Sequence, residues 1–117
     1  MEIKYKYKKT EKQCTDFSCA NKEFNKRVAT LLFSRINFIE NAESLADIIN
    51  NPTFNFHDLE GKMKGLYAID LGRKIGYRLI LEPLNEKEES LKTERDIHKL
   101  KQCTKVILVI EVSNHYE

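Results

Sequence analysis

The apolar run at residues 105–112, KVILVIEV, constrains the fold of this sequence more than any other feature. Its apolar side chains follow one another without the alternation of a strand that has one solvated face, so we expect a strand buried on both faces. Such a strand lies inside a sheet and is covered above and below. A chain of 117 residues, 41% hydrophobic and 32% charged, has the length and balance of a single globular domain.

The first half of the chain changes from a two-residue period to a helical period. Residues 2–7 alternate polar and apolar side chains, which predicts a half-buried strand. From about Glu11 the apolar positions recur at offsets of three and four residues. We therefore expect three helical segments, near residues 11–20, 22–42 and 44–50. Ser44 is the expected N-cap of the last segment, and Pro52 follows its end.

After Pro52 the period returns to two. Strands are predicted at residues 54–59, 65–71, 77–82 and 105–112. Residues 84–102 form a charged insertion, with a short helix near 91–100. An order of strand, helices and then consecutive strands predicts an α+β fold, with two to three helices on one face of a mostly antiparallel sheet. We expect one domain over residues 1–117.

Charge is distributed unevenly along the chain, although the formal net charge is only +2. Segments 1–37 and 62–78 are basic, and segment 82–98 is acidic. Basic segments attract the phosphate backbone of nucleic acids. A lysine-rich surface also serves simply to keep a protein in solution, so charge alone does not separate these two interpretations.

Several classes of protein are disfavoured by the sequence. The N-terminus, MEIKYKYKK, is charged where a secretory signal needs an apolar stretch, and no apolar run is long enough to span a membrane. Cys14, Cys19 and Cys103 lack the paired spacing of a zinc site. We expect reduced thiols, no metal, no cofactor and a cytoplasmic location.

Three segments in this order resemble the HigB branch of the RelE/ParE toxin superfamily. They are Ser44–Leu71, where a helix ends at a proline and a histidine, a leucine, a glycine and a strand follow; Gly76–Pro83, an arginine-bearing strand; and Val106–Tyr116, a closing strand with a polar tail. The likeness covers nearly the whole chain outside 84–102. The sequence departs from the family pattern in two places: the tail reads Asn-His-Tyr instead of acidic-Tyr-His, and Glu60 stands where a lysine is common.

The resemblance implies a RelE-like fold and a toxin of a type II toxin–antitoxin system. Such a toxin is a metal-independent endoribonuclease, or mRNA interferase, that cleaves mRNA on the ribosome and arrests translation. It also implies a cognate antitoxin, a HigA-like helix-turn-helix protein. The toxin would contact operator DNA only through this antitoxin. No cofactor and no membrane are involved.

RNA cleavage without a metal needs a base, an acid and cations near the phosphate. Arg78 is the candidate for the phosphate, mainly because the resemblance places an arginine in this apolar strand; its planar fork can bind two oxygens. The alternative is an ion pair with Glu82 or another carboxylate. His57 suits proton transfer near neutral pH, or else it is a surface histidine bonded to Asp58. His115 is a candidate acid or base.

Tyr116 is the last of the catalytic candidates and is suited to stacking on a base or to sharing the proton transfer. The alternative for the tail is a frayed end with no role. Asn114 is expected to orient one of the tail residues. The turns beside the strands supply four further candidates for binding the RNA backbone, each of which is otherwise a solvated surface charge: Lys62, Lys64, Arg73 and Lys74.

Two other functions fit the same fold. ParE-like members of the superfamily inhibit DNA gyrase by binding it, without catalysis. A domain that only binds RNA or the ribosome is the third possibility, and fold alone does not separate the three. The imidazoles at positions 57 and 115 favour the ribonuclease, because a pure binder has no need of groups that exchange protons.

Overall fold

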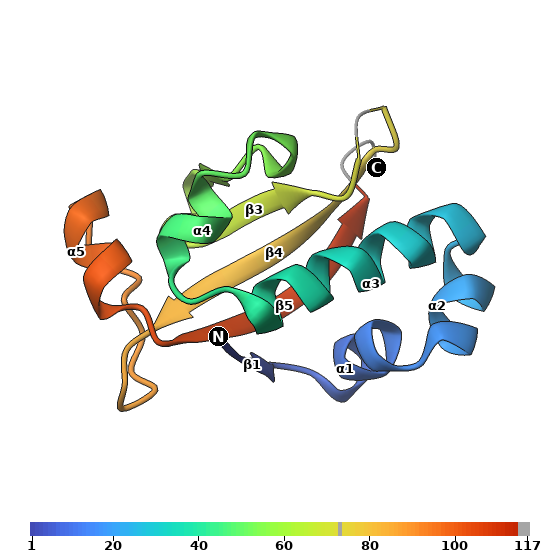
Figure 1. Cartoon of the computed structure of the whole chain (residues 1–117), viewed down its shortest axis with the longest axis horizontal. Helices are drawn as coiled ribbons and strands as arrows, with labels where there is room; N and C mark the ends of the chain where they lie inside the picture. The colour runs from blue at the N-terminus through green and yellow to red at the C-terminus, as the bar shows by residue number, and fades with distance from the viewer. Residues whose placement is uncertain (73, 115–117) are drawn as a thin grey trace.

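The computed structural model describes residues 1–72 and 74–114. In this part of the chain, a five-stranded sheet is combined with five α-helices and two short 3₁₀ turns (Figure 1). The strands are β1 (Glu2–Tyr5), β2 (His57–Asp58), β3 (Tyr67–Asp70), β4 (Tyr77–Leu84) and β5 (Val106–Asn114). The helices are α1 (Lys8–Thr15), α2 (Phe17–Glu23), α3 (Lys26–Asn41), α4 (Leu45–Ile49) and α5 (Ile97–Cys103), and the 3₁₀ turns are η1 (Pro52–Phe54) and η2 (Gly61–Met63).

The sheet has the order β1-β5-β4-β3-β2. Strands β5, β4, β3 and β2 pair antiparallel, while β1 runs parallel to β5. The predicted α+β class with a mostly antiparallel sheet is therefore confirmed. Strand β5, the predicted buried strand, lies between β1 and β4, so both of its edges are hydrogen-bonded.

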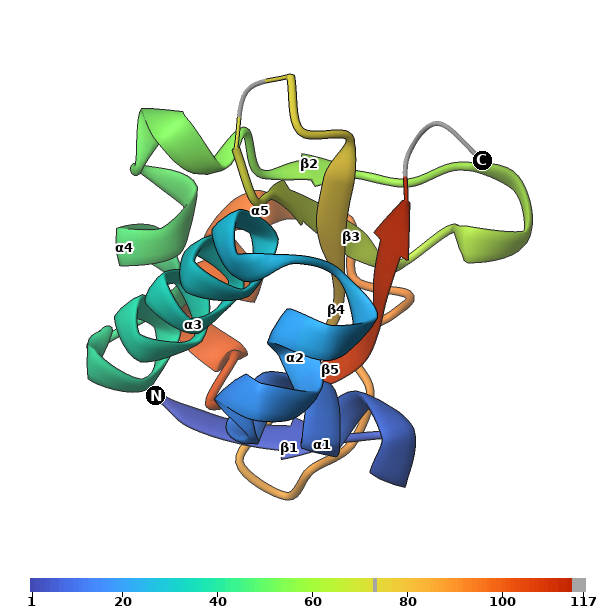
Figure 2. The same ribbon diagram turned by 90° about the vertical axis from the view of Figure 1, so that its right-hand side faces the viewer.

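Helices cover one face of the sheet (Figure 2). The main core joins this face to α3 and α4, and its members include Leu32, Ile39, Ile69, Leu79 and Val109. A smaller apolar cluster lies on the other face, where the segment that connects β2 to β3 projects away from the helices (Figure 2). Its buried members are Leu59, Ala68, Ile80 and Ile110. Both faces of β4 and β5 are thus covered along part of their length.

Capping side chains set the helix boundaries, and they differ from the predicted ones. A single helix was expected near 11–20, but the chain forms α1 and α2, because Asp16 interrupts it and accepts a hydrogen bond from Cys19 N at 3.2 Å. Ser44 occupies the N-cap position of α4, but its side chain makes no capping hydrogen bond. Instead, the Asp47 carboxylate accepts from Glu43 N at 2.9 Å.

The predicted strand at 54–59 is mostly wrong. Pro52 opens the turn η1, and Asn55 adopts the left-handed conformation (φ 48°), so only His57 and Asp58 remain extended and paired as β2. In the 84–102 insertion, the helix begins at Ile97 rather than near residue 91.

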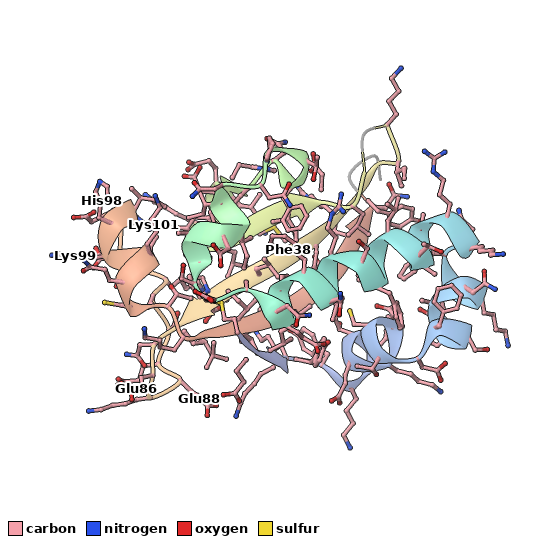
Figure 3. The ribbon with its side chains drawn as sticks, in the orientation of Figure 1. Phe38, Glu86, Glu88, His98, Lys99 and Lys101 are labelled. Atoms are coloured by element: carbon pink, nitrogen blue, oxygen red, sulfur yellow. The ribbon has the colours of Figure 1, made fainter. Side chains whose placement is uncertain are left out.

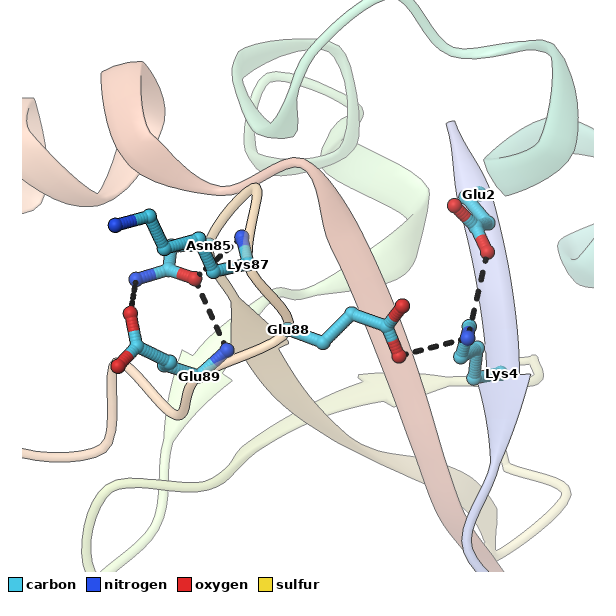
Figure 4. A network of polar contacts seen from close by, with 6 residues as sticks. All are labelled: Glu2, Lys4, Asn85, Lys87, Glu88 and Glu89. Carbon is cyan, nitrogen blue, oxygen red and sulfur yellow. Dashed lines mark hydrogen bonds and ion pairs between the residues drawn. The ribbon is translucent and has the colours of Figure 1, made fainter.

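The insertion is attached to the N-terminal strand. Glu88 forms an ion pair with Lys4 of β1 at 2.7 Å, and Lys4 also lies 3.8 Å from Glu2 (Figure 4). The Asn85 side chain organises the turn by accepting hydrogen bonds from Lys87 N and Glu89 N, each at 2.9 Å. Across the described residues, no helix has the length and apolar character needed to cross a membrane.

Candidate functional site

Arg78 lies in β4, opposite Asp70 of β3 and Ser113 of β5. Directly paired residues share a face of the sheet, so all three are on the face away from the helices, with Ile80. The Arg78 side chain is half-buried, and its buried Nε atom has no hydrogen-bond partner among the residues that the structure describes. Among residues 1–72 and 74–114, no carboxylate forms an ion pair with Arg78, so the alternative of a pair with Glu82 is wrong.

The closing strand β5 runs beside the arginine-bearing strand β4. The two pair antiparallel from Tyr77 and Asn114 at one end to Leu84 and Val106 at the other. Asn114 is the last residue that the structure describes; it is half-buried and pairs with Tyr77. His115, Tyr116 and Arg73 lie outside the described residues, so their proposed roles stay predictions.

His57 is on the same face of the sheet, in the edge strand β2. It pairs with Ala68, which pairs with Ile80 of β4. Its Nδ1 atom lies 2.6 Å from the carbonyl oxygen of Asn55. Because a carbonyl oxygen only accepts, Nδ1 carries the proton, and in the neutral ring the Nε2 lone pair is free to take another. The alternative of a bond between His57 and Asp58 is wrong.

His57 and Arg78 do not touch. They lie two strands apart, which is about 10 Å across the sheet. Ala68 and Ile80 lie between them and are fully buried. They form a cluster with the buried Leu59, against which the partly buried Met63 and Leu66 pack. The segment that follows β2 therefore packs over Ala68 and Ile80 on this face of the sheet.

A pocket of about 720 Å³ lies beside His57. Its apolar wall includes Ile49, Phe56 and Leu100, and its charged rim is formed by Asp58, Glu60, Lys64 and Arg95. Tyr67 also lines it, stacked on Phe56 with ring centroids 5.0 Å apart. Burial raises the pKa of Tyr67, Arg95 opposes that rise, and Asp58 and Glu94 add to it.

Arg95 is a pocket residue that the sequence did not suggest. It belongs to the 84–102 insertion, which was expected to be an elaboration outside the predicted site. Gly65 explains how the insertion reaches the pocket: its φ is +94°, and a Cβ there would lie 2.5 Å from the Lys92 carbonyl oxygen. Only glycine allows this close approach. His98 of the same insertion is exposed on α5 and does not line the pocket (Figure 3).

The lysines predicted to bind RNA fall into two groups at opposite ends of β3. Lys62 and Lys64 are exposed in and after η2, before β3 begins, and Lys64 lines the His57 pocket. Lys74 is exposed in the turn between β3 and β4, at the end where Arg78 lies. The structure therefore separates Lys62 and Lys64 from Lys74 by the length of a strand.

Comparison with models of protein families, with curated proteins and with solved structures finds no match. The resemblance to HigB-type toxins consequently rests on the sequence segments alone. Within the described part of the chain, no group of three or more histidine, cysteine or acidic side chains is arranged to hold a metal ion.

Proposed function

We propose that this chain is a cytoplasmic endoribonuclease of the HigB kind, which cleaves mRNA on the ribosome without a metal ion and is neutralised by a helix-turn-helix antitoxin. The observation that supports it best is the state of Arg78. A half-buried guanidinium with an unpaired Nε and no carboxylate partner among the described residues is costly to maintain unless an anion binds it. The phosphate of an RNA strand is such an anion.

The proposed reaction is an internal transfer at phosphorus. The ribose 2′-hydroxyl gives its proton to a base, and its oxygen forms a bond to phosphorus. The bond from phosphorus to the 5′-oxygen breaks, and that oxygen takes a proton from an acid, leaving a 2′,3′-cyclic phosphate. Arg78 stabilises the negative charge that builds on the non-bridging oxygens.

His57 is suited to the base, because the carbonyl of Asn55 holds its ring and leaves Nε2 unprotonated in the neutral form. The sequence supports His115 as the second proton-transfer group, with Tyr116 and Asn114 beside it. The ribosome would position the message against these groups.

The test is to add purified protein to a translating extract and to map the 5′ ends of the fragments. We expect the rate of cutting to fall by about 10² or more for Arg78→Ala. His57→Ala and His115→Ala should also cut slowly. Arg27→Ala, which removes an exposed arginine from α3, is the matched control and should cut normally.

Full-rate cutting by a folded Arg78→Ala variant contradicts the site. Intact messages together with loss of gyrase supercoiling support the ParE-like alternative instead. Binding to ribosomes with neither effect supports an inactive RNA-binding domain.

A further inference from the structure

A second arginine, Arg35, lies close to Arg78. It too has no carboxylate partner among the described residues. Arg35 of α3 is half-buried, and its Nε donates a hydrogen bond to the backbone oxygen of Asp70 at 3.0 Å. The centre of its guanidinium lies 4.6 Å from the centroid of the Phe54 ring. A hydrogen bond at one end and an aromatic face beneath together fix the plane of the group before any ligand arrives.

No described residue forms a hydrogen bond or ion pair with the outer nitrogens of Arg35. In the part of the chain that the structure describes, the Asp70 bond is the only hydrogen bond that Arg35 makes, and it forms no ion pair. The Asp70 carboxylate accepts from Asn55 Nδ2 at 3.1 Å instead. Burial lowers the pKa of Arg35 and the nearby Asp70 raises it, and the guanidinium stays charged at neutral pH.

These groups surround a cavity of about 600 Å³, lined by Arg35, Pro52, Thr53, Asn55, Asp70 and Gly72. The lining combines a cation, which suits a phosphate, with a carboxylate, which suits a hydroxyl or N–H donor. A simple anion would be repelled by the carboxylate, whereas a ligand that carries both a phosphate and hydrogen-bond donors satisfies both groups. A nucleotide is such a ligand.

The cavity adjoins the proposed cleavage site. Asp70 is the direct cross-strand neighbour of Arg78. Within the described residues, strand β2 pairs only with Tyr67 and Ala68, so at Asp70 the strand β3 is the free edge of the sheet. An RNA strand bound at Arg78 can therefore pass around this edge to reach Arg35 on the helix-covered side.

We propose that this cavity binds one nucleotide of the RNA strand whose cleaved phosphate lies at Arg78, with Arg35 on its phosphate and Asp70 accepting a hydrogen bond from its sugar or base. The inference rests on the proposed function and adds to it a subsite away from the reacting atoms. Arg35 is accordingly a substrate-binding residue and not a catalytic one.

The test measures binding and cleavage separately. A fluorescent single-stranded hexaribonucleotide is titrated with each variant at low salt, its integrity is checked on a gel, and its affinity is read from anisotropy. We expect Arg35→Gln to weaken binding at least tenfold. Arg27→Gln makes the same charge change at an exposed position of the same helix and should change affinity less than twofold. If Asp70 binds the sugar, Asp70→Asn should reduce the preference for the RNA hexamer over the deoxy hexamer. If Asp70 binds the base, the variant should instead reduce the preference for particular bases.

A measurement on the wild-type chain covers the case in which a variant fails to fold. In ¹⁵N-labelled protein, the backbone amides of Thr53, Asn55 and Gly72 should shift saturably with a nucleoside 5′-monophosphate. Equal shifts with inorganic phosphate would overturn the nucleotide assignment in favour of a plain anion site. The absence of any shift, with Arg35→Gln binding RNA normally, would overturn the subsite altogether.

The two proposals fail in different ways. If Arg78→Ala loses cleavage while Arg35→Gln keeps its affinity for the hexamer, the ribonuclease stands and the subsite is rejected. If Arg35→Gln loses affinity while Arg78→Ala still cuts, the subsite stands and the placement of the chemistry at Arg78 is rejected.

Discussion

At the scale of single residues, the proposed site consists of two half-buried arginines, Arg78 and Arg35. Neither forms an ion pair with a carboxylate of the described residues. Arg78 has its Nε buried without a partner, and Arg35 uses one nitrogen on a backbone oxygen. A buried donor without an acceptor costs about 1–3 kcal/mol. Such groups persist where a ligand completes them, and they trade stability for function.

Replacing Arg78 with methionine should therefore stabilise the chain while abolishing cleavage. Methionine keeps much of the apolar stem and removes the unpaired Nε, so we expect the free energy of unfolding to rise by about 1 kcal/mol. Urea unfolding followed by circular dichroism measures it. Arg27→Met, at an exposed site, should stay within about 0.5 kcal/mol of wild type. A clear loss of stability in Arg78→Met would mean that the guanidinium has a structural role.

Two of the three cysteines should differ sharply in reactivity. Cys14 is 2% exposed, and burial raises the pKa of its thiol to about 12, so almost no thiolate is present at pH 8. Cys103 is exposed at the end of α5. Iodoacetamide at pH 8 should modify Cys103 in the native protein and Cys14 only after urea is added, as read by peptide mass spectrometry. Equal native rates at the two thiols would contradict the buried position of Cys14.

Sequence reasoning found some of these residues and could not find others. An arginine inside an apolar strand is conspicuous, and the resemblance to HigB-type toxins places an arginine in that strand, so Arg78 could be named as a candidate from the sequence. Arg35 and Arg95 give no such signal, because each looks like an ordinary surface charge on a helix or loop. Their significance comes from contacts distant in sequence: Arg35 meets Asp70, 35 positions away, and Arg95 shares a pocket with His57.

At the scale of elements, periodicity located the helices and strands, while individual side chains decided where they end. The apolar stripe predicted the long helix α3, but its start depends on Asn25, whose side chain accepts from Val28 N at 2.9 Å. Asp16 divides the segment before it into α1 and α2. The strand predicted at 54–59 shrank to two residues because Asn55 turns the chain, which a two-residue hydropathy pattern does not reveal.

The N-cap hydrogen bond at Asn25 should contribute measurably to the free energy of unfolding. It supports the start of α3, the helix that carries Arg35. Asn25→Ala leaves the Val28 amide without its side-chain acceptor, and we expect a loss of about 1 kcal/mol in the free energy of unfolding. Asn21→Ala, at an exposed position of α2 with no side-chain hydrogen bond among the described residues, is the control and should cost much less. Equal losses in the two variants would mean that the α3 cap contributes nothing beyond helix propensity.

At the scale of the whole molecule, the sequence order predicted the class of fold but not how distant segments meet. The parallel pairing of β1 with β5 joins the two ends of the chain, and no local pattern specifies it. The insertion was predicted as a charged elaboration, yet Glu88 attaches it to β1 (Figure 4). Arg95 of the same insertion reaches the His57 pocket, and Leu100 enters the core. The site is therefore assembled from elements whose proximity exists only in the folded chain.

The junction of β1, α1 and the core should make the whole fold sensitive to alkali. Burial raises the pKa of Tyr5 on β1 well above its ordinary value of 10.0, with smaller contributions from Cys14, Glu40 and Glu11. Burial likewise raises the pKa of Cys14 from 9.0. Below about pH 8 both groups are mostly protonated in the folded and unfolded chains, so their contribution to stability is nearly constant. Above it the unfolded chain releases protons that the folded chain retains, and stability falls as the pH rises.

Urea unfolding at several pH values from 7 to 11 measures this loss. Tyr5→Phe keeps the ring in the core but removes the ionisable hydroxyl, so its stability should fall less steeply between pH 10 and 11 than that of wild type. Tyr7→Phe makes the same change at a side chain that is 52% exposed, and it should follow the wild-type curve. If Tyr5→Phe and wild type lose stability in parallel above pH 10, the Tyr5 hydroxyl ionises as readily in the folded chain as in the unfolded one. In that case β1 does not shield Tyr5 as the structure indicates.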